Sequence, residues 1–270
     1  MATMAMPEAR PDNLSGTPRA HALDRWIFVL MALWFIVLAL IGFIPDSLVK
    51  VGMVRAGLRP PFPLVLHMHA VLIGAFLLFL LSQTWMVATG RCALHRKLGP
   101  LGGLLAVALV IVGFILAPTM YHQVHDGLAA APPAAHGAIR ALLARLDNIL
   151  LLQMQAGTLF ALFIALALLN RTRDTGFHKR LMIFAPAMAL GAAFARMPWL
   201  PQTIPASPLS ILCYQWLALA PMFVWDVVRN RRIHRAYIVL VACYLPFNIV
   251  ALMLWDTPWW HATAARLMGV

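Results

Sequence analysis

The sequence predicts an all-α, polytopic membrane protein built as a bundle of seven transmembrane helices, and three observations lead to this prediction. Hydrophobic residues make up 62% of the chain and charged residues only 11%, a composition far from that of soluble globular domains. Apolar stretches long enough to cross the ~30 Å hydrocarbon core recur along the chain. Lys and Arg gather in alternate connections between these stretches, as the positive-inside rule requires.

The apolar stretches divide the chain into a tail, a membrane domain and a second tail. Residues 1–25 lack the continuous apolar core of a signal peptide, so we expect a flexible cytoplasmic tail. Residues 26–256 form the transmembrane domain, and residues 257–270 a short external tail. The seven predicted helices lie near 26–44, 64–88, 99–117, 148–169, 180–198, 208–228 and 236–256.

Two of these helices contain many small residues, which let membrane helices approach each other closely. They are the third, 99–117, and the fifth, 180–198, so we expect both to lie centrally in the bundle. The fifth also contains Pro186, which removes a backbone donor and predicts a kink.

The distribution of basic residues predicts the orientation of the chain. With the N-terminus in the cytoplasm and the C-terminus outside, the inner segments hold fourteen of the 21 Lys and Arg residues and the outer segments seven. The net charge of +12 therefore reflects topology, and it does not indicate a nucleic-acid partner. The chain is rich in Ala, Leu and Arg, which favours the plasma (inner) membrane of a bacterium. The three cysteines suggest no disulfide framework.

The longest predicted connection, 118–147, is external and rich in histidine. It contains His122, His125 and His136 around an Ala-Ala-Pro-Pro-Ala-Ala centre. We expect that centre to separate two short helical pieces.

Polar side chains at membrane depth are costly and usually face the bundle interior or a water-filled cavity. Many of those in this chain fall in the outer half of the predicted bundle, so we predict an externally open polar pocket. Its predicted lining is His69, His122, His125, Asp147, Gln155, Arg196 and Gln215, with Tyr214, Asn248 and Gln83 as further polar members. The alternative is that each side chain only bonds to a neighbouring helix.

A second pair of histidines lies at the predicted inner face. His95 and His178 occupy matching places, in Leu-His-Arg-Lys-Leu before the third helix and in Phe-His-Lys-Arg-Leu-Met before the fifth. Such basic clusters anchor helix ends at the interface. The alternative is that the two imidazoles ligate something or bind anionic headgroups.

Several of these short sequence motifs together resemble the pattern of a known family. Its pattern is a histidine opening a helix, Gln83, Gly90-Arg91 and His95-Arg96-x-Leu98-Gly99, then much later His178-Lys179-Arg180-Leu181-Met182 and a helix ending in Arg196. This resembles a group of bacterial integral membrane proteins defined by a domain of unknown function, over residues 66–118 and 176–198. The resemblance implies a helical membrane bundle and supplies no reaction. It points to His69 or His67, Gln83, Arg91, His95, His178 and Arg196 as positions to test.

The first hypothesis for function is a haem- or metal-binding protein that transfers electrons. Imidazoles from different helices can ligate the iron of haem b while an arginine pairs with its propionates, and such proteins often react with quinone or another redox partner. His69 with His122 or His125 would hold an outer haem. The candidate cofactor-binding residues are His69, His122, His125, His95, His178 and Arg196.

Two other classes of function stay open. A metal-dependent membrane hydrolase would use zinc, copper or iron to activate water. Its candidate ligands are His67, His69, His122, His125 and Asp147. His67 is the looser candidate, because two residues on a helix diverge by ~200°. A non-enzymatic transporter or assembly subunit needs no such site. The sequence therefore leaves open whether the protein is an enzyme.

Overall fold

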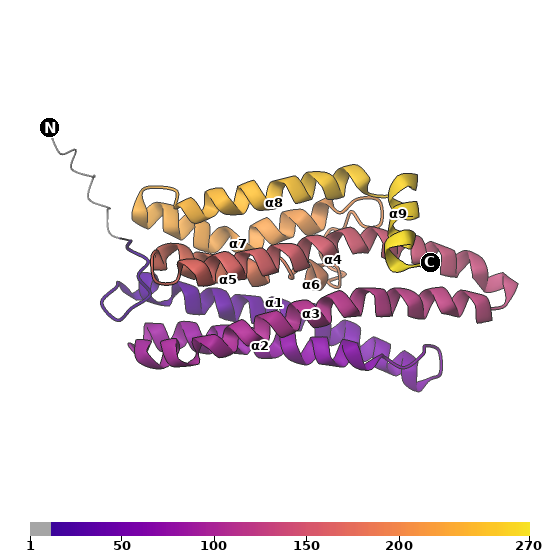
Figure 1. Cartoon of the computed structure of the whole chain (residues 1–270), viewed down its shortest axis with the longest axis horizontal. Coiled ribbons are helices and arrows are strands. Elements are labelled where there is room, and N and C mark those ends of the chain that lie inside the picture. The colour runs from indigo at the N-terminus through magenta and orange to yellow at the C-terminus, as the bar shows by residue number, and fades with distance from the viewer. Residues whose placement is uncertain (1–11) are drawn as a thin grey trace.

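The computed structural model describes residues 12–270, and this part of the chain is helical and contains no strand. The long helices lie side by side along one axis (Figure 1), so the all-α prediction is confirmed. The helices are α1 (Ala22–Arg55), α2 (Leu64–Ala88), α3 (Cys92–Ala130), η1 (Pro133–Ala135), α4 (His136–Asn170), α5 (Thr175–Ala187), α6 (Gly191–Phe194), α7 (Leu209–Asn230), α8 (Arg235–Leu254) and α9 (Pro258–Met268).

Six helices are long and apolar enough to cross a membrane, which is the architecture of a multi-pass membrane protein. They are α1, α2, α3, the η1–α4 stretch Pro133–Asn170, α7 and α8. Six of the seven predicted segments are therefore confirmed as long apolar helices. The remaining one, 180–198, is not a continuous helix and is not confirmed as a span.

The break in that segment has a local cause. Pro186 lies one residue before the end of α5. Beyond it the amides of Met188, Ala189 and Leu190 each bond to the carbonyl three residues earlier, the tight pattern of a 3₁₀ turn. The helix therefore ends one residue after Pro186, at the place where the sequence predicts a kink.

Several elements extend beyond their predicted bounds. Most of the predicted external loop 118–147 is helical, because α3 continues to Ala130 and α4 begins at His136. The predicted break at the Pro-Pro centre is confirmed, since only a short turn and η1 separate the two helices. Residues 257–270 hold α9, which packs on the bundle through the buried Trp260.

The two ends of the bundle are distinguished by the chain termini (Figure 1). We call the end at which α1 begins the N-terminal end, and the end at which α9 lies the C-terminal end. The turns between α2 and α3, α4 and α5, and α7 and α8 all lie at the N-terminal end.

The core forms around α5, as the small residues of the fifth segment predict. Phe184 and Leu181 of α5 are fully buried, and Phe184 stacks on Phe163 of α4 with ring centroids 6.3 Å apart. The third segment differs from its prediction, because few residues of α3 are buried. Gly42 of α1 permits the closest approach to α6, since a Cβ there would lie 2.5 Å from the carbonyl oxygen of Ala193.

Candidate functional site

The histidines predicted to line one outer pocket lie apart along α2 and α3. His67 is exposed, whereas His69 is half-buried and packs against Gly113, 3.6 Å from the position of a Cβ there. His122 lies nine residues beyond Gly113 on α3, which is ~13 Å along a helix axis. His122 and His125 form their own pair, with ring centroids 6.5 Å apart. The geometry therefore gives no support to an ion or haem shared between His69 and this pair.

Asp147 is buried, and its partners are different from those predicted. Its carboxylate accepts a hydrogen bond from the Tyr121 hydroxyl at 2.9 Å and contacts His261 Nδ1 at 2.9 Å. Its backbone carbonyl accepts from the indole of Trp260 at 2.7 Å. These contacts attach α9 to α4. His261, which the sequence reasoning missed, lies in the segment taken for an external tail.

The other predicted pocket residues bond in pairs with neighbouring helices. The side-chain amides of Gln155 and Asn248 meet at 2.5 Å. Gln215 accepts from the Tyr244 hydroxyl at 2.5 Å and donates to the Met188 carbonyl at 2.6 Å. These contacts match the alternative of separate inter-helix bonds.

Tyr214 and Arg196, two further residues of the predicted pocket, also bond to separate neighbours. The hydroxyl of Tyr214 donates to the carbonyl of Pro201 at 2.5 Å. Arg196 pairs with Asp46 of α1 at 3.1 Å and lies over the ring of Phe43. Within residues 12–270, the hydrogen bonds and ion pairs of the Arg196 side chain go to Asp46 and to the Ala192 carbonyl, and none of them involves a histidine of the predicted haem set.

At the N-terminal end, in contrast, two of the predicted histidines lie near each other. The imidazole of His95, on the first turn of α3, interacts with the backbone of Gln83 near the end of α2. It is also close enough to His178 of α5 for the two rings to interact electrostatically. The most extensive helix contacts of the bundle join α2 to α3, α3 to α4 and α4 to α5, so these four helices are neighbours. Arg91 lies exposed at the neighbouring turn.

The hydrogen bond of His178 fixes its tautomer. Its Nδ1 lies 2.8 Å from the carbonyl oxygen of Ala167 on α4. Because a carbonyl can only accept, Nδ1 holds the proton and Nε2 presents a lone pair. A backbone carbonyl holding one ring N–H in this way is the usual outer partner of a metal-ligating histidine.

His95 and Gln83 present further polar atoms without partners. Within the described part of the chain, the buried Nδ1 of His95 and both side-chain amide atoms of Gln83 have no hydrogen-bond partner. Gln83 is only 7% exposed. Leaving such a group unpaired costs about 1–3 kcal/mol, so the unpartnered amide of Gln83 and the unpartnered Nδ1 of His95 mark this end of α2 and α3 as a candidate binding site. We call His95, His178 and Gln83 the two-histidine site.

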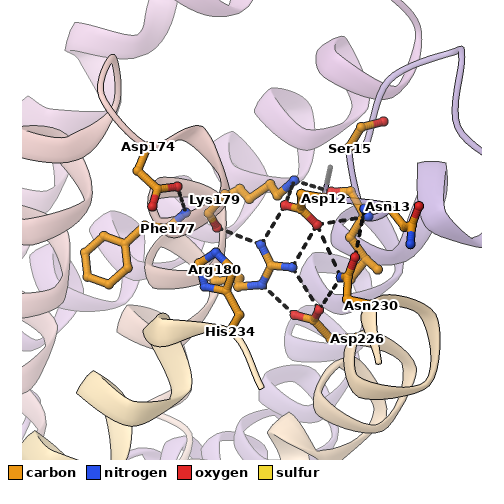
Figure 2. A network of polar contacts seen from close by, with 12 residues as sticks. Asp12, Asn13, Ser15, Asp174, Phe177, Lys179, Arg180, Asp226, Asn230 and His234 are labelled. Carbon is orange, nitrogen blue, oxygen red and sulfur yellow. Dashed lines mark hydrogen bonds and ion pairs between the residues drawn. The ribbon is translucent and has the colours of Figure 1, made fainter. Parts of the chain in front are cut away.

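A second polar cluster at the same end surrounds Arg180 of α5 (Figure 2). The side chains of Arg180 and Asp226 are both fully buried and meet at 2.5 Å. The opposite edge of the guanidinium binds Asp12, at 2.9 and 3.1 Å. Burial raises the pKa of Asp12, but the hydrogen bond of Arg180 and the charges of Lys179 and Arg180 outweigh this effect and hold the pKa below its ordinary value. We call these residues the Arg180 network.

The sequence reasoning missed the Arg180 network because it counted Lys179 and Arg180 as topological cations. The available signal was Asp226, an acidic residue within the predicted segment 208–228, since such residues mark buried pairs or sites. His234, which caps α8, also lies at this cluster. Burial and the charge of Arg180 lower its pKa to about 4.

Comparisons with protein-family models, with curated proteins and with solved structures find no match for this chain. Among residues 12–270, no three His, Cys, Asp or Glu side chains gather as metal ligands. The predicted metal set of His67, His69, His122, His125 and Asp147 is therefore not assembled in the structure.

Proposed function

We propose that this integral membrane protein binds a transition-metal ion at the two-histidine site and uses it for electron transfer. The observations that support the proposal are the lone pair of His178 Nε2, oriented by the Ala167 carbonyl, the unpartnered Nδ1 of His95 and the electrostatic interaction between the two imidazoles. The Gln83 amide would supply an oxygen ligand. Two neutral imidazoles and one amide oxygen suit copper or zinc, and copper adds redox chemistry.

A single ion fits this site better than haem b. A porphyrin needs a slot between its two axial ligands. Here Ala167 and Leu181, next to the histidines in α4 and α5, are fully buried in the packed core. The two best-formed surface grooves, of about 400 and 280 Å³, are lined by apolar residues and Ser, without a histidine. The ligand set also favours binding or electron transfer over hydrolysis, because it lacks the third nitrogen or carboxylate ligand of typical hydrolytic zinc sites.

Metal analysis of the detergent-purified protein tests this proposal. The protein is loaded with copper or zinc, dialysed, and measured for bound metal. We expect about one equivalent in the wild type and a loss of most of it in His178→Ala and His95→Ala. His125→Ala is the matched control and retains the metal. Equal binding by wild type and His178→Ala, or a Soret band of bound haem in the visible spectrum, would overturn the proposal.

We further propose that the chain crosses the membrane seven times, with α5 and α6 as a broken fifth crossing, the N-terminus in the cytoplasm and the C-terminus outside. Two features support this: α1 begins and α9 lies at opposite ends of the bundle (Figure 1), and the segments at the N-terminal end hold most Lys and Arg. In a variant without native cysteines, an impermeant maleimide should label Ala262→Cys in intact cells. It should label Arg91→Cys only after permeabilisation, and the reverse pattern would refute this orientation.

A further inference from the structure

The carboxylate of Asp12 is bound by donors from two helices. Arg180 of α5 donates from both terminal nitrogens, at 2.9 Å to Oδ2 and 3.1 Å to Oδ1. Lys179 Nζ lies 2.6 Å from Oδ2, and Asn230 of α7 donates to Oδ1 at 3.3 Å. Figure 2 shows these donors converging on one carboxylate. Two parallel N–H bonds from one guanidinium are the geometry of carboxylate recognition.

The guanidinium of Arg180 is also held by partners on the helices other than Asp12. The inner edge of the Arg180 guanidinium is fixed by Asp226 of α7, at 2.5 and 2.9 Å, and by the carbonyl of Gly176 at 2.8 Å. Arg180 and Asp226 are fully buried. The outer edge of the guanidinium therefore points at the same place whether or not Asp12 is there.

Residues at the ends of the helices also bound the space that the carboxylate occupies. A Cβ on Gly176 would lie 3.0 Å from Asp12 Oδ2 and 3.1 Å from His234 Nε2. A side chain at position 176 would therefore intrude where the carboxylate lies. The buried hydroxyl of Tyr237 also lies beside the Arg180–Asp226 pair.

The charged side chains of α5 and α7 that surround Asp12 are not neutral without it. Lys179 and Arg180 contribute two positive charges and Asp226 one negative charge, so the helices present one net positive charge that Asp12 neutralises. Asp12 itself comes from residues 12–20, which form neither helix nor strand. This segment is docked by the fully buried Leu14 and by hydrogen bonds from Asn13 to Asn230 and to the Arg229 carbonyl.

We propose that Arg180, Lys179 and Asn230 form a binding site for the carboxylate group of a small monoanionic ligand, which enters from the N-terminal end of the bundle, and that Asp12 occupies this site in cis. The planar donor pair matches the two oxygens of a carboxylate, which is the group that Asp12 places there. One net positive charge matches a monoanion. This site is separate from the two-histidine site and does not depend on a metal.

Chemical rescue tests the proposal. Asp12→Ala removes the occupant, and the thermal unfolding midpoint of the detergent-purified protein is then measured against sodium acetate at constant ionic strength. We expect Asp12→Ala to unfold at a lower temperature than wild type. Acetate should have little effect on its midpoint at concentrations well below the dissociation constant. Above that constant, the midpoint should rise with the logarithm of the acetate concentration. The wild type, with its site occupied, should show little response.

Two matched variants distinguish this site from a general salt effect. Asp12→Ala combined with Lys179→Ala should lose most of the acetate response, because a site cation is gone. Asp46→Ala breaks a partly exposed pair with Lys50 and Arg196 and should not be rescued. If Asp12→Ala cannot be purified, Asp12→Asn keeps the shape, loses the charge and undergoes the same titration.

Three results would overturn the proposal. The first is a folded Asp12 variant whose midpoint does not respond to acetate. The second is an equal response in Asp46→Ala, which would make the effect non-specific. The third is a larger shift with phosphate than with acetate at equal concentration, which would reject the carboxylate class.

Discussion

Removing Asp226 should unfold this protein far more readily than removing a carboxylate from its surface. In Asp226→Ala the guanidinium of Arg180 stays fully buried and loses its bonds of 2.5 and 2.9 Å. Only Asp12 remains as a charged partner, and its side chain is 22% exposed, so water screens part of its effect. Breaking a buried ion pair from one side costs about 3–5 kcal/mol, which is the loss in free energy of unfolding that we expect.

The matched control is Asp46→Ala. Its pairs with Lys50 and Arg196 are 25–31% exposed, and such pairs contribute about 0–1 kcal/mol. Reversible unfolding in mixed micelles, followed by tryptophan fluorescence, would measure both variants.

A double variant separates the free-energy cost of leaving one buried charge unpaired from the net contribution of the ion pair to stability. Arg180→Met with Asp226→Leu removes both charges and replaces them with apolar groups. It should be closer to wild type than Asp226→Ala, because an apolar replacement of a buried pair is often neutral or stabilising. The reasoning is refuted if Asp226→Ala lowers the free energy of unfolding no more than Asp46→Ala does. It is also refuted if the loss in the double variant equals the sum of the losses in Arg180→Met and Asp226→Leu measured singly.

Two further predictions concern His261 of α9 and Gly42 of α1. Burial lowers the pKa of His261, but its hydrogen bonds to Asp147 and Asp256 outweigh this and raise the pKa above its ordinary value. The stabilisation is therefore complete below pH ~6.5 and is lost as pH rises through the folded-state pKa. Proteolysis between α8 and α9 should accelerate over that range in wild type but not in His261→Gln. Gly42→Ala, whose Cβ would lie 2.5 Å from the Ala193 carbonyl oxygen, should cost about 1–3 kcal/mol of unfolding free energy. Gly52→Ala, which contacts nothing within 4 Å, should cost nothing.

The positions of most helices could be predicted from sequence because they depend on local properties. A run of apolar residues in lipid must satisfy its own backbone hydrogen bonds, so it forms a helix wherever it occurs. Pro186 and the Pro-Pro centre of the predicted loop interrupted helices as expected, because the loss of an amide donor is a property of the residue itself. The helical extent of the loop and the docking of α9 were missed, since both depend on contacts such as that of Trp260 with Asp147.

The candidate sites divide in the same way. Sequence identified Gln83, His95 and His178 as positions to test, and in the structure His95 interacts with the backbone of Gln83 and, electrostatically, with His178. It also grouped His69 with His122 on depth alone, although depth does not fix the distance between two helices.

Sequence by itself determined the class of this protein, its apolar helices and the asymmetry of its basic residues. Only the tertiary structure decided what Arg180 does. Its partners Asp12 and Asp226 lie 168 and 46 residues away in the chain. Which side chains meet across a bundle depends on the rotation and register of each helix, and close packing of the whole core sets these. A cation that sequence assigns to the membrane surface can therefore be fully buried in the bundle.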